Sequence, residues 1–312
     1  MSTAAPEGTG WARAARAFAR EVESGTGGDV KVKWYFGGIT GDEVQSAERV
    51  RRDQLDGIAS GGGLCARLSP SMRVGRVLGL LQGRDEARYV LGRLKPELDV
   101  EFRKSGFTNL ALAGIGPDIL FSRAPVRSLG DLRHGRWWTW DVDEFFAAQL
   151  PALGIASHAL PLDAAARAYD AGEIAGFITS PTAALAFQWS VQARYVEELH
   201  LGFNSGCLLV ADRAFDALPP SAQQVMRSAA ARFATQVEEL GRQQDDALLG
   251  GLFERQGLRP VAVSESFRSE FLESARTARD QLGDAVVPQA VILRVSTWLA
   301  DYRADHRNRG ER

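Results

Sequence analysis

The 312-residue sequence has little cysteine and little histidine: two cysteines, Cys65 and Cys207, and four scattered histidines. Two cysteines are too few for a disulfide framework or a zinc site of the usual kind. We expect both to be small, buried, apolar side chains, and the sequence leaves open whether they are free. Because the histidines show no ligand spacing, we expect no histidine-based metal site, and no cofactor is implied.

The sequence also lacks an excess of charge and any long apolar run. The net charge is −2 and the pI is about 6.2, which excludes the overall basic field of a nucleic-acid-binding protein. No apolar run approaches the ~20 residues that span a bilayer. The first residues, MSTAAPEGTGWARAARAF, contain neither the basic leader nor the apolar segment of a signal peptide. Taken alone, this start indicates a cytoplasmic protein.

Catalytic motifs are missing as well. The sequence has no GxSxG, HExxH or CxxC element, and its glycine-rich stretch FGGITGDE fits neither a P-loop nor GxGxxG. With 45% hydrophobic and 24% charged residues, the composition is that of an ordinary globular protein, and the length suggests about two domains. These features favour a binding protein over an enzyme.

Helical and strand patterns alternate along the whole chain, which predicts α/β layers around mostly parallel sheets. We expect helices over 11–28, 84–106, 142–154 and 162–172, and a very long helix over 221–257 that is broken near 250–251. Strands are predicted over 30–36, 56–60, 107–114, 118–122, 136–140, 175–179 and 196–211, and a loop over 61–70. Ligands in such sheets bind beyond the carboxyl ends of the strands, so the strand-to-helix junctions are the places to look.

The junction RWWTWDVDEF, residues 136–145, concentrates three of the seven tryptophans within four positions. Side chains alternate on a strand, so Trp138 and Trp140 should share one face and Trp137 the other. We predict that Trp138 and Trp140 line a ligand pocket, although all three could be core residues. Asp141, with Glu144 three residues later, has the spacing of a capping box, and it is a ligand candidate as well.

Other junctions supply further candidates. Ser180 and the proline after it are typical of a helix start, and this start points its backbone amides above the sheet. Phe36 and Gly37 lie where glycines allow a close approach of the backbone. Arg67 and Asn204 complete the set of predicted ligand-binding residues.

Several stretches together resemble the solute-binding proteins of TRAP (tripartite ATP-independent periplasmic) transporters. They are residues 5–57, which close on an LDG; RAPVRSLGDLRHGRWWTW; YDAGEIAGF; and ADRAFDALPPSAQQVM. The resemblance covers nearly the whole chain in order. It implies a class II periplasmic-binding-protein fold of two α/β lobes joined by hinge strands and braced by a long helix. It also implies a small organic ligand, delivered to membrane permease subunits without chemistry.

The resemblance sets two further expectations. Lobe I is expected to hold residues 1–122 and about 207–250, lobe II 123–206 and about 251–300, with 301–312 a charged tail. The protein is expected to be periplasmic, with the signal peptide and the start of the first strand missing before MSTA. A ligand-binding sensor component on the same fold, and an α/β enzyme acting on a hydrophobic substrate, are the alternatives.

The sequence departs from the family at one position. Most members carry an arginine there that grips the ligand's carboxylate, and here Trp138 occupies the place, as in a Trp-rich branch of the family. Arg136, two residues earlier, could substitute only if the register slips. Trp138 and Trp140 would form a flat apolar wall, which favours an aromatic, bulky apolar or weakly charged ligand.

Overall fold

The computed structural model describes residues 1–284 and 286–310. Its strands are β1 Ser2–Thr3, β2 Gly57–Ser60, β3 Phe107–Ser122, β4 Arg136–Trp140, β5 Ala156–Leu160, β6 Gly176–Thr179, β7 Tyr195–Ala211 and β8 Arg259–Val261. The longer helices are α1 Gly10–Gly25, α2 Glu43–Arg51, α4 Arg84–Lys104, α7 Leu162–Asp170, α11 Pro220–Ala247, α13 Glu265–Asp280 and α14 Gln289–Gly310. The shorter ones are α3 Gly63–Leu68, α5 Leu129–His134, α6 Glu144–Gln149, α8 Pro181–Ala186, α9 Trp189–Gln192, α10 Asp212–Asp216 and α12 Phe253–Arg255. The 3₁₀ turns η1 Pro70–Arg76 and η2 Leu150–Leu153 and the π turn η3 Leu248–Leu252 complete the elements.

One mixed sheet runs through the molecule in the order β1-β2-β7-β3-β6-β4-β5, and β8 also pairs with β7. The end strands pair in parallel, β1 with β2 and β4 with both β5 and β6. The two longest strands, β3 and β7, run antiparallel from Phe107 opposite Ala211 to Ser122 opposite Tyr195. The prediction of a mostly parallel sheet is therefore wrong at the centre, because periodicity along one strand carries no information about the direction of its neighbour.

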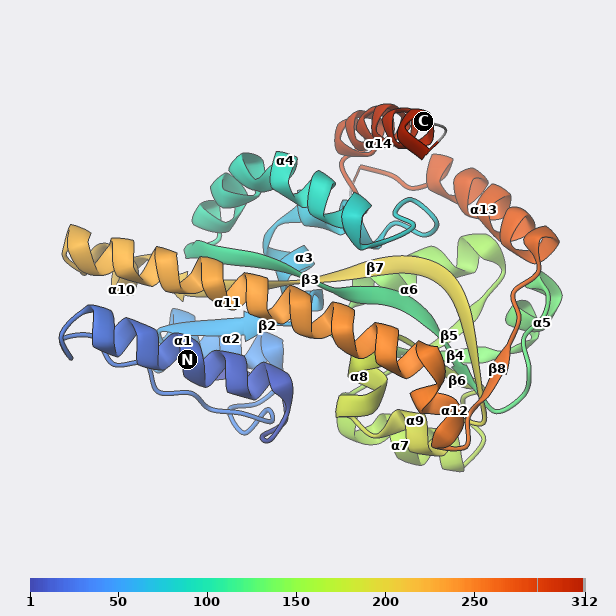
Figure 1. The fold of residues 1–312 in the computed structure, drawn as a ribbon, viewed down its shortest axis with the longest axis horizontal. Helices are drawn as coiled ribbons and strands as arrows, with labels where there is room; N and C mark the ends of the chain where they lie inside the picture. The colour runs from blue at the N-terminus through green and yellow to red at the C-terminus, as the bar shows by residue number, and fades with distance from the viewer. Residues whose placement is uncertain (285, 311–312) are drawn as a thin grey trace.

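The fold has two lobes, and β3 and β7 cross from one to the other (Figure 1). One lobe carries α1 to α4 at one end of these strands, and the other carries α5 to α9 at the opposite end. The β3–β7 register shifts three times, including once between Gly114 and Gly116, midway along the strand. Helix α11 packs on α1, on β3 and on α8, so it braces both lobes, as the resemblance implies.

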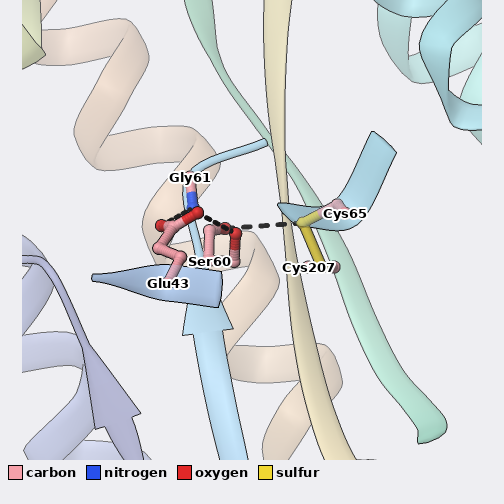
Figure 2. Close-up of a disulfide and its surroundings, with 5 residues drawn as sticks. All are labelled: Glu43, Ser60, Gly61, Cys65 and Cys207. Carbon is pink, nitrogen blue, oxygen red and sulfur yellow. Dashed lines mark hydrogen bonds between the residues drawn. A yellow bond between two sulfur atoms is a disulfide. The ribbon is translucent and has the colours of Figure 1, made fainter. Parts of the chain in front are cut away.

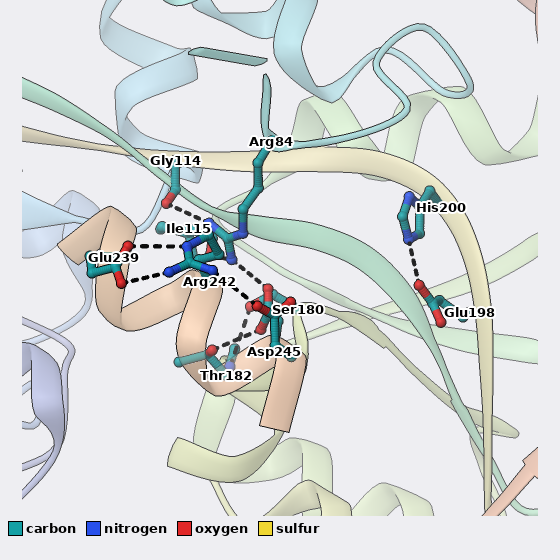
Figure 3. Close-up of polar contacts among 12 residues, drawn as sticks. Arg84, Gly114, Ile115, Ser180, Thr182, Glu198, His200, Glu239, Arg242 and Asp245 are labelled. Carbon is teal, nitrogen blue, oxygen red and sulfur yellow. Dashed lines mark hydrogen bonds and ion pairs between the residues drawn. The ribbon is translucent and has the colours of Figure 1, made fainter. Parts of the chain in front are cut away.

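A buried ion pair ties the middle of β3 to α4 and α11 (Figure 3). Arg84, at the start of α4, pairs with Asp245 of α11 and donates hydrogen bonds to the backbone oxygens of Gly114 at 3.2 Å and Ile115 at 2.8 Å. Thr182 of α8 donates to the other carboxylate oxygen of Asp245 at 2.9 Å. Because Asp245 is 5% exposed, its charge depends on these partners, and the network joins elements of both lobes.

The long C-terminal helices lie on different lobes. Helix α13 packs against α5 and η2, whereas α14 packs against α4 and η1. Residues Val291, Val295 and Leu299 of α14 belong to the same apolar core as Leu94 of α4. Of residues 301–312, expected to form a charged tail, 301–310 continue α14, and 311–312 lie outside the described residues. The exact lobe boundaries stay a prediction.

Most helices were predicted from periodicity, including the break of the long helix, where Gly250 and Gly251 leave helical geometry. Three local predictions are wrong. Residues 30–36 alternate as a strand does but form no strand, because only Tyr35 bridges to the first residues of the chain. The expected loop at 61–70 contains α3, and the two strands expected within 107–122 are one.

Candidate functional site

The tryptophan-rich stretch forms β4 between β5 and β6, and its side chains alternate as predicted. Trp137 is 1% exposed, packs in the core beneath α5 and donates from Nε1 to the backbone oxygen of Leu132 at 2.8 Å. Trp138 and Trp140 face a different apolar cluster, on the other side of the sheet. The predicted capping role of Asp141 is wrong: Asp143 caps α6, accepting a hydrogen bond from the backbone amide of Phe146.

Trp138 and Trp140 border a cleft of roughly 1200 Å³, a volume that includes open solvent at its mouth. Its lining comes from both lobes, with β1, α1 and β2 on one side and β4, β6 and α8 on the other. The centres of β3 and β7 pass behind it. The aromatic residues that line it are Trp11, Trp138, Trp140, Phe146, Phe187, Trp189 and Phe233. The cleft therefore lies where the two lobes face each other.

The aromatic side of the cleft is organised around Trp189. Its ring stacks on Phe177 at 5.1 Å and on Phe187 at 5.2 Å between centroids, and Trp138 leans on it at 4.6 Å. Trp138 is 4% exposed, and its Nε1 donates to the backbone oxygen of Leu160 at 3.0 Å. Since its polar atom is already satisfied, Trp138 offers the cleft only an apolar aromatic surface.

Arg76 is the single cationic side chain among the described residues that line the cleft. Its guanidinium lies 3.1 Å from Oδ2 of Asp118 and 2.9 Å from Oδ2 of Asp143, and it sits 4.5 Å over the ring of Phe146. The Asp118 contact is an ion pair without hydrogen-bond alignment, since Nε and Oδ2 each lack a hydrogen-bond partner. Burial raises the pKa of Asp118 to about 6, against the opposing charge of Arg76.

A third carboxylate also lines the cleft. It belongs to Glu43 at the start of α2, which is drawn in Figure 2. It accepts hydrogen bonds from the hydroxyl of Ser60 at 2.6 Å and the backbone amide of Gly61 at 2.8 Å. Glu43 is 3% exposed, and burial raises its pKa despite these bonds. The nearby charge of Asp143 raises it further. We call Glu43, Asp118 and Asp143 the carboxylate cluster. Among the described residues, no group of acids, histidines or cysteines has the arrangement of a metal site.

Cys65 and Cys207 form a disulfide between α3 and β7, next to Ser60 and the cleft (Figure 2). Both residues are buried as expected, but the interpretation as two simple apolar side chains is wrong. They lie 142 residues apart in sequence, so no spacing pattern could reveal the pair. Disulfides persist in oxidising compartments outside the cytoplasm.

The predicted ligand residues fall into three groups. Trp138, Trp140 and Asn204 line the cleft. Phe36 and Gly37 line a second, smaller hollow with Trp34 and Ile39. The other three line neither: Arg67 pairs with Glu144 on the surface, Asp141 is exposed, and Ser180 caps α8 through the amide of Ala183. Arg136, the possible substitute for the family's arginine, is also exposed.

The charged residues of the cleft escaped sequence reasoning. Arg76 ends a 3₁₀ turn, and Asp118 interrupts an apolar strand. The one available signal was Asp118, since a lone acid within an apolar strand requires a buried partner. Glu43 and Asp143 read as ordinary helix-start acids, as Glu43 follows the N-cap Asp42 and Asp143 is itself an N-cap.

Comparison with known proteins places the chain in a family. The family model described as bacterial extracellular solute-binding protein, family 7, matches residues 1–283. A protein of Verminephrobacter eiseniae named a solute-binding protein is 26% identical over 232 residues, which cover 74% of this chain and 69% of the relative.

Solved structures share the fold at low sequence identity. A TRAP periplasmic solute-binding protein of Chromohalobacter salexigens, with bound D-glucuronate, has a TM-score of 0.86 and 18% identity over 95% of this chain and 98% of its own. A solute receptor of Bordetella pertussis that binds pyroglutamic acid has a TM-score of 0.84 and 17% identity, with the same coverage. A third, from Polaromonas, is bound to D-erythronate, with a TM-score of 0.86 and 16% identity over 95% and 96% of the two chains.

Proposed function

Because the chain belongs to the bacterial extracellular solute-binding proteins of family 7, we propose that it captures a small organic solute in the cleft between its lobes. It is a solute receptor of the TRAP type and not an enzyme. The captured solute passes unchanged to the permease subunits of a TRAP transporter in the membrane. The periplasm is the compartment where this takes place. Within the described residues, no helix is both long and apolar enough to cross a bilayer.

The observation that carries the proposal is the position of the cleft. Its walls come from both lobes, and the crossing strands β3 and β7 behind it are irregular at the same level, at the Gly114–Gly116 register shift. Two lobes that share a bound solute close on it, since contacts with both favour the closed population. A receptor uses this change to signal occupancy to its permease.

The solute presents a ring or another sizeable apolar surface to the cleft. Trp138, Trp140 and Trp189 supply flat apolar area on one side, and Asn204 supplies a polar group opposite. The three solved structures compared above hold acids, but among the described lining residues here Arg76 is the single cation, and it is already paired. Trp138, Trp140 and Asn204 are the proposed solute contacts.

Native mass spectrometry of the protein, purified without unfolding from a cell grown on a complex medium, tests the proposal. We expect a bound molecule at one per chain, and its release on denaturation. A Trp140→Ala variant should retain less of it, whereas the control Trp298→Ala, a half-buried residue of α14 outside the cleft lining, should retain the wild-type amount. Protein that carries no solute, and that binds none when incubated with a fractionated metabolite extract, would refute a receptor function.

A further inference from the structure

We propose that the solute carries a positively charged amine or ammonium group, which binds between the carboxylate cluster and the aromatic wall of the cleft. This inference rests on the proposed function and specifies its ligand class. The three solved structures compared above hold acids, so the inference departs from them.

The charge of the cleft is the first observation. Three carboxylates line it, and Arg76 is the one cation among the described lining residues. Asp118 and Asp143 both contact the guanidinium of Arg76, and Asp143 also lies near enough to Glu43 for its charge to raise the pKa of Glu43. With all of them ionised, the lining carries two uncompensated negative charges. Such a lining attracts a cation and repels a free carboxylate.

The engagement of Arg76 is the second observation. A guanidinium that grips an acid must present two N–H groups side by side to it. Here Nε faces Asp118 at 3.1 Å, Nη2 faces Asp143 at 2.9 Å, and the flat face of the group lies on an aromatic ring. A carboxylate bound at Arg76 would lie beside both of these acids. Arg76 therefore organises the carboxylate cluster and does not replace the family's ligand-binding arginine.

Unused hydrogen-bond groups inside the cleft are the third observation. Thr139 is 2% exposed and lines the cleft, and its hydroxyl has no partner. The Oδ1 atom of Asn204, also in the lining, is buried without a partner. Such groups are costly to leave unsatisfied. The Oδ1 atom of Asn204 can only accept a hydrogen bond, so it suits an N–H group of an ammonium, whereas the Thr139 hydroxyl can accept or donate.

The aromatic lining fits the same ligand class. Tryptophan is the ring that attracts cations most strongly, and four of the chain's seven tryptophans line this cleft. The buried acids of the carboxylate cluster supply the negative charge that compensates the charge of a bound cation. Because burial raises the pKa of Asp118 and of Glu43, the empty cleft holds these charges at a cost, and a bound cation would offset that cost.

Matched probes of equal shape test the charge requirement by isothermal calorimetry on the full chain. Choline is compared with dimethylbutanol, its neutral carbon analogue, and phenethylamine with phenylethanol and with phenylpropionate. D-Glucuronate serves as the acid that a solved relative holds. We expect the cation of each set to bind about tenfold or more tightly than its neutral analogue, the scale of a charge-assisted contact. We expect the two acids to bind least.

Two variants test whether the carboxylate cluster binds the cation. Asp118→Asn and Glu43→Gln keep the size of each side chain and should each weaken binding of the cations about tenfold. Binding of the neutral analogues should stay as it is. Glu173→Gln, an exposed acid outside the cleft lining, is the matched control. A merely structural role of the two acids would weaken binding of cations and neutral analogues alike, which would contradict the inference.

The inference and the receptor function fail in different ways. If D-glucuronate binds more tightly than both cations, or if neutral analogues equal them, the charge assignment is wrong while the receptor function stands. The charge assignment is also wrong if neither cation binds and the solute released from natively purified protein is an acid. If no probe binds and the protein carries no solute, the receptor function itself fails.

Discussion

Glu197 of β7 is fully buried in the second lobe, and its protonation should control stability near neutral pH. Burial raises the pKa of Glu197 to about 7, and the bonds to its carboxylate lower it only in part. One of these comes from the backbone amide of Val126 at 2.9 Å. The Ser122 hydroxyl lies 3.2 Å from both carboxylate oxygens and 2.7 Å from the backbone oxygen of Ala124. A hydroxyl has one proton, so a Ser122 that donates to Ala124 can accept from a protonated Glu197.

The magnitude follows from linkage. The folded protein keeps this proton up to about pH 7, whereas the unfolded chain loses it near the ordinary value of 4.5. Between these values the folded state binds more protons, so the free energy of unfolding falls as the pH rises. The stabilising contribution is complete below about pH 4.5 and is lost through about pH 7, a total of about 3 kcal/mol.

Glu197→Gln removes the titration and keeps the shape. The amide of the new side chain can donate to Ser122, and its oxygen can accept from Val126. We expect the variant to match wild type within ~1 kcal/mol near pH 5 and to exceed its stability by about 3 kcal/mol near pH 8.5. Urea unfolding of both proteins between pH 5 and pH 8.5 measures the difference between their free energies of unfolding. Other groups, such as Asp118, titrate in both proteins, so their contributions cancel in this difference. A difference that stays constant with pH would refute the reasoning.

Three further predictions follow from single contacts. Trp137→Ala should lower the free energy of unfolding in urea by about 3–5 kcal/mol. Trp140→Ala should instead weaken calorimetric binding of the co-purified solute by ~1–3 kcal/mol, with little change in stability. If the two variants had equal effects on both measurements, the alternation of faces along β4 would be contradicted. Replacing Cys65 and Cys207 together by alanine should lower the free energy of unfolding by about 2–4 kcal/mol, and a reductant should then have no further effect. Arg84→Met should cost about 3–5 kcal/mol in the same assay, because it leaves Asp245 buried without its cation, and an unchanged midpoint would contradict that account.

The order of the elements was largely predictable because periodicity and helix-boundary signals are local. The helix over 10–25, for example, combines an apolar stripe with an N-cap threonine and a glycine end. Residues 30–36 show the limit of such reasoning. Over 30–34 their alternation separates half-buried residues from the exposed lysines, but a strand also needs a neighbour to pair with, and that neighbour is set by the tertiary fold.

The candidate site was predictable only in part on its aromatic side, which centres on the unpredicted Trp189, and it was not predictable on its charged side. Trp138 and Trp140 follow from one strand and its alternation. The carboxylate cluster is assembled from α2, β3 and the start of α6, which lie far apart in the sequence. Asp143 reads as an ordinary helix cap and is one, and only the fold reveals that its second oxygen pairs with Arg76. Likewise, only the fold reveals that Cys65 and Cys207 form a disulfide.

A crystal structure of the protein with its co-purified solute tests the central claim most directly. The account predicts one solute molecule in the cleft, its apolar part against Trp138 and Trp140, and its charged group within hydrogen-bond distance of Glu43 or Asp118. Density for the solute elsewhere would contradict the account, for example in the small hollow beside Phe36, with the cleft free of solute.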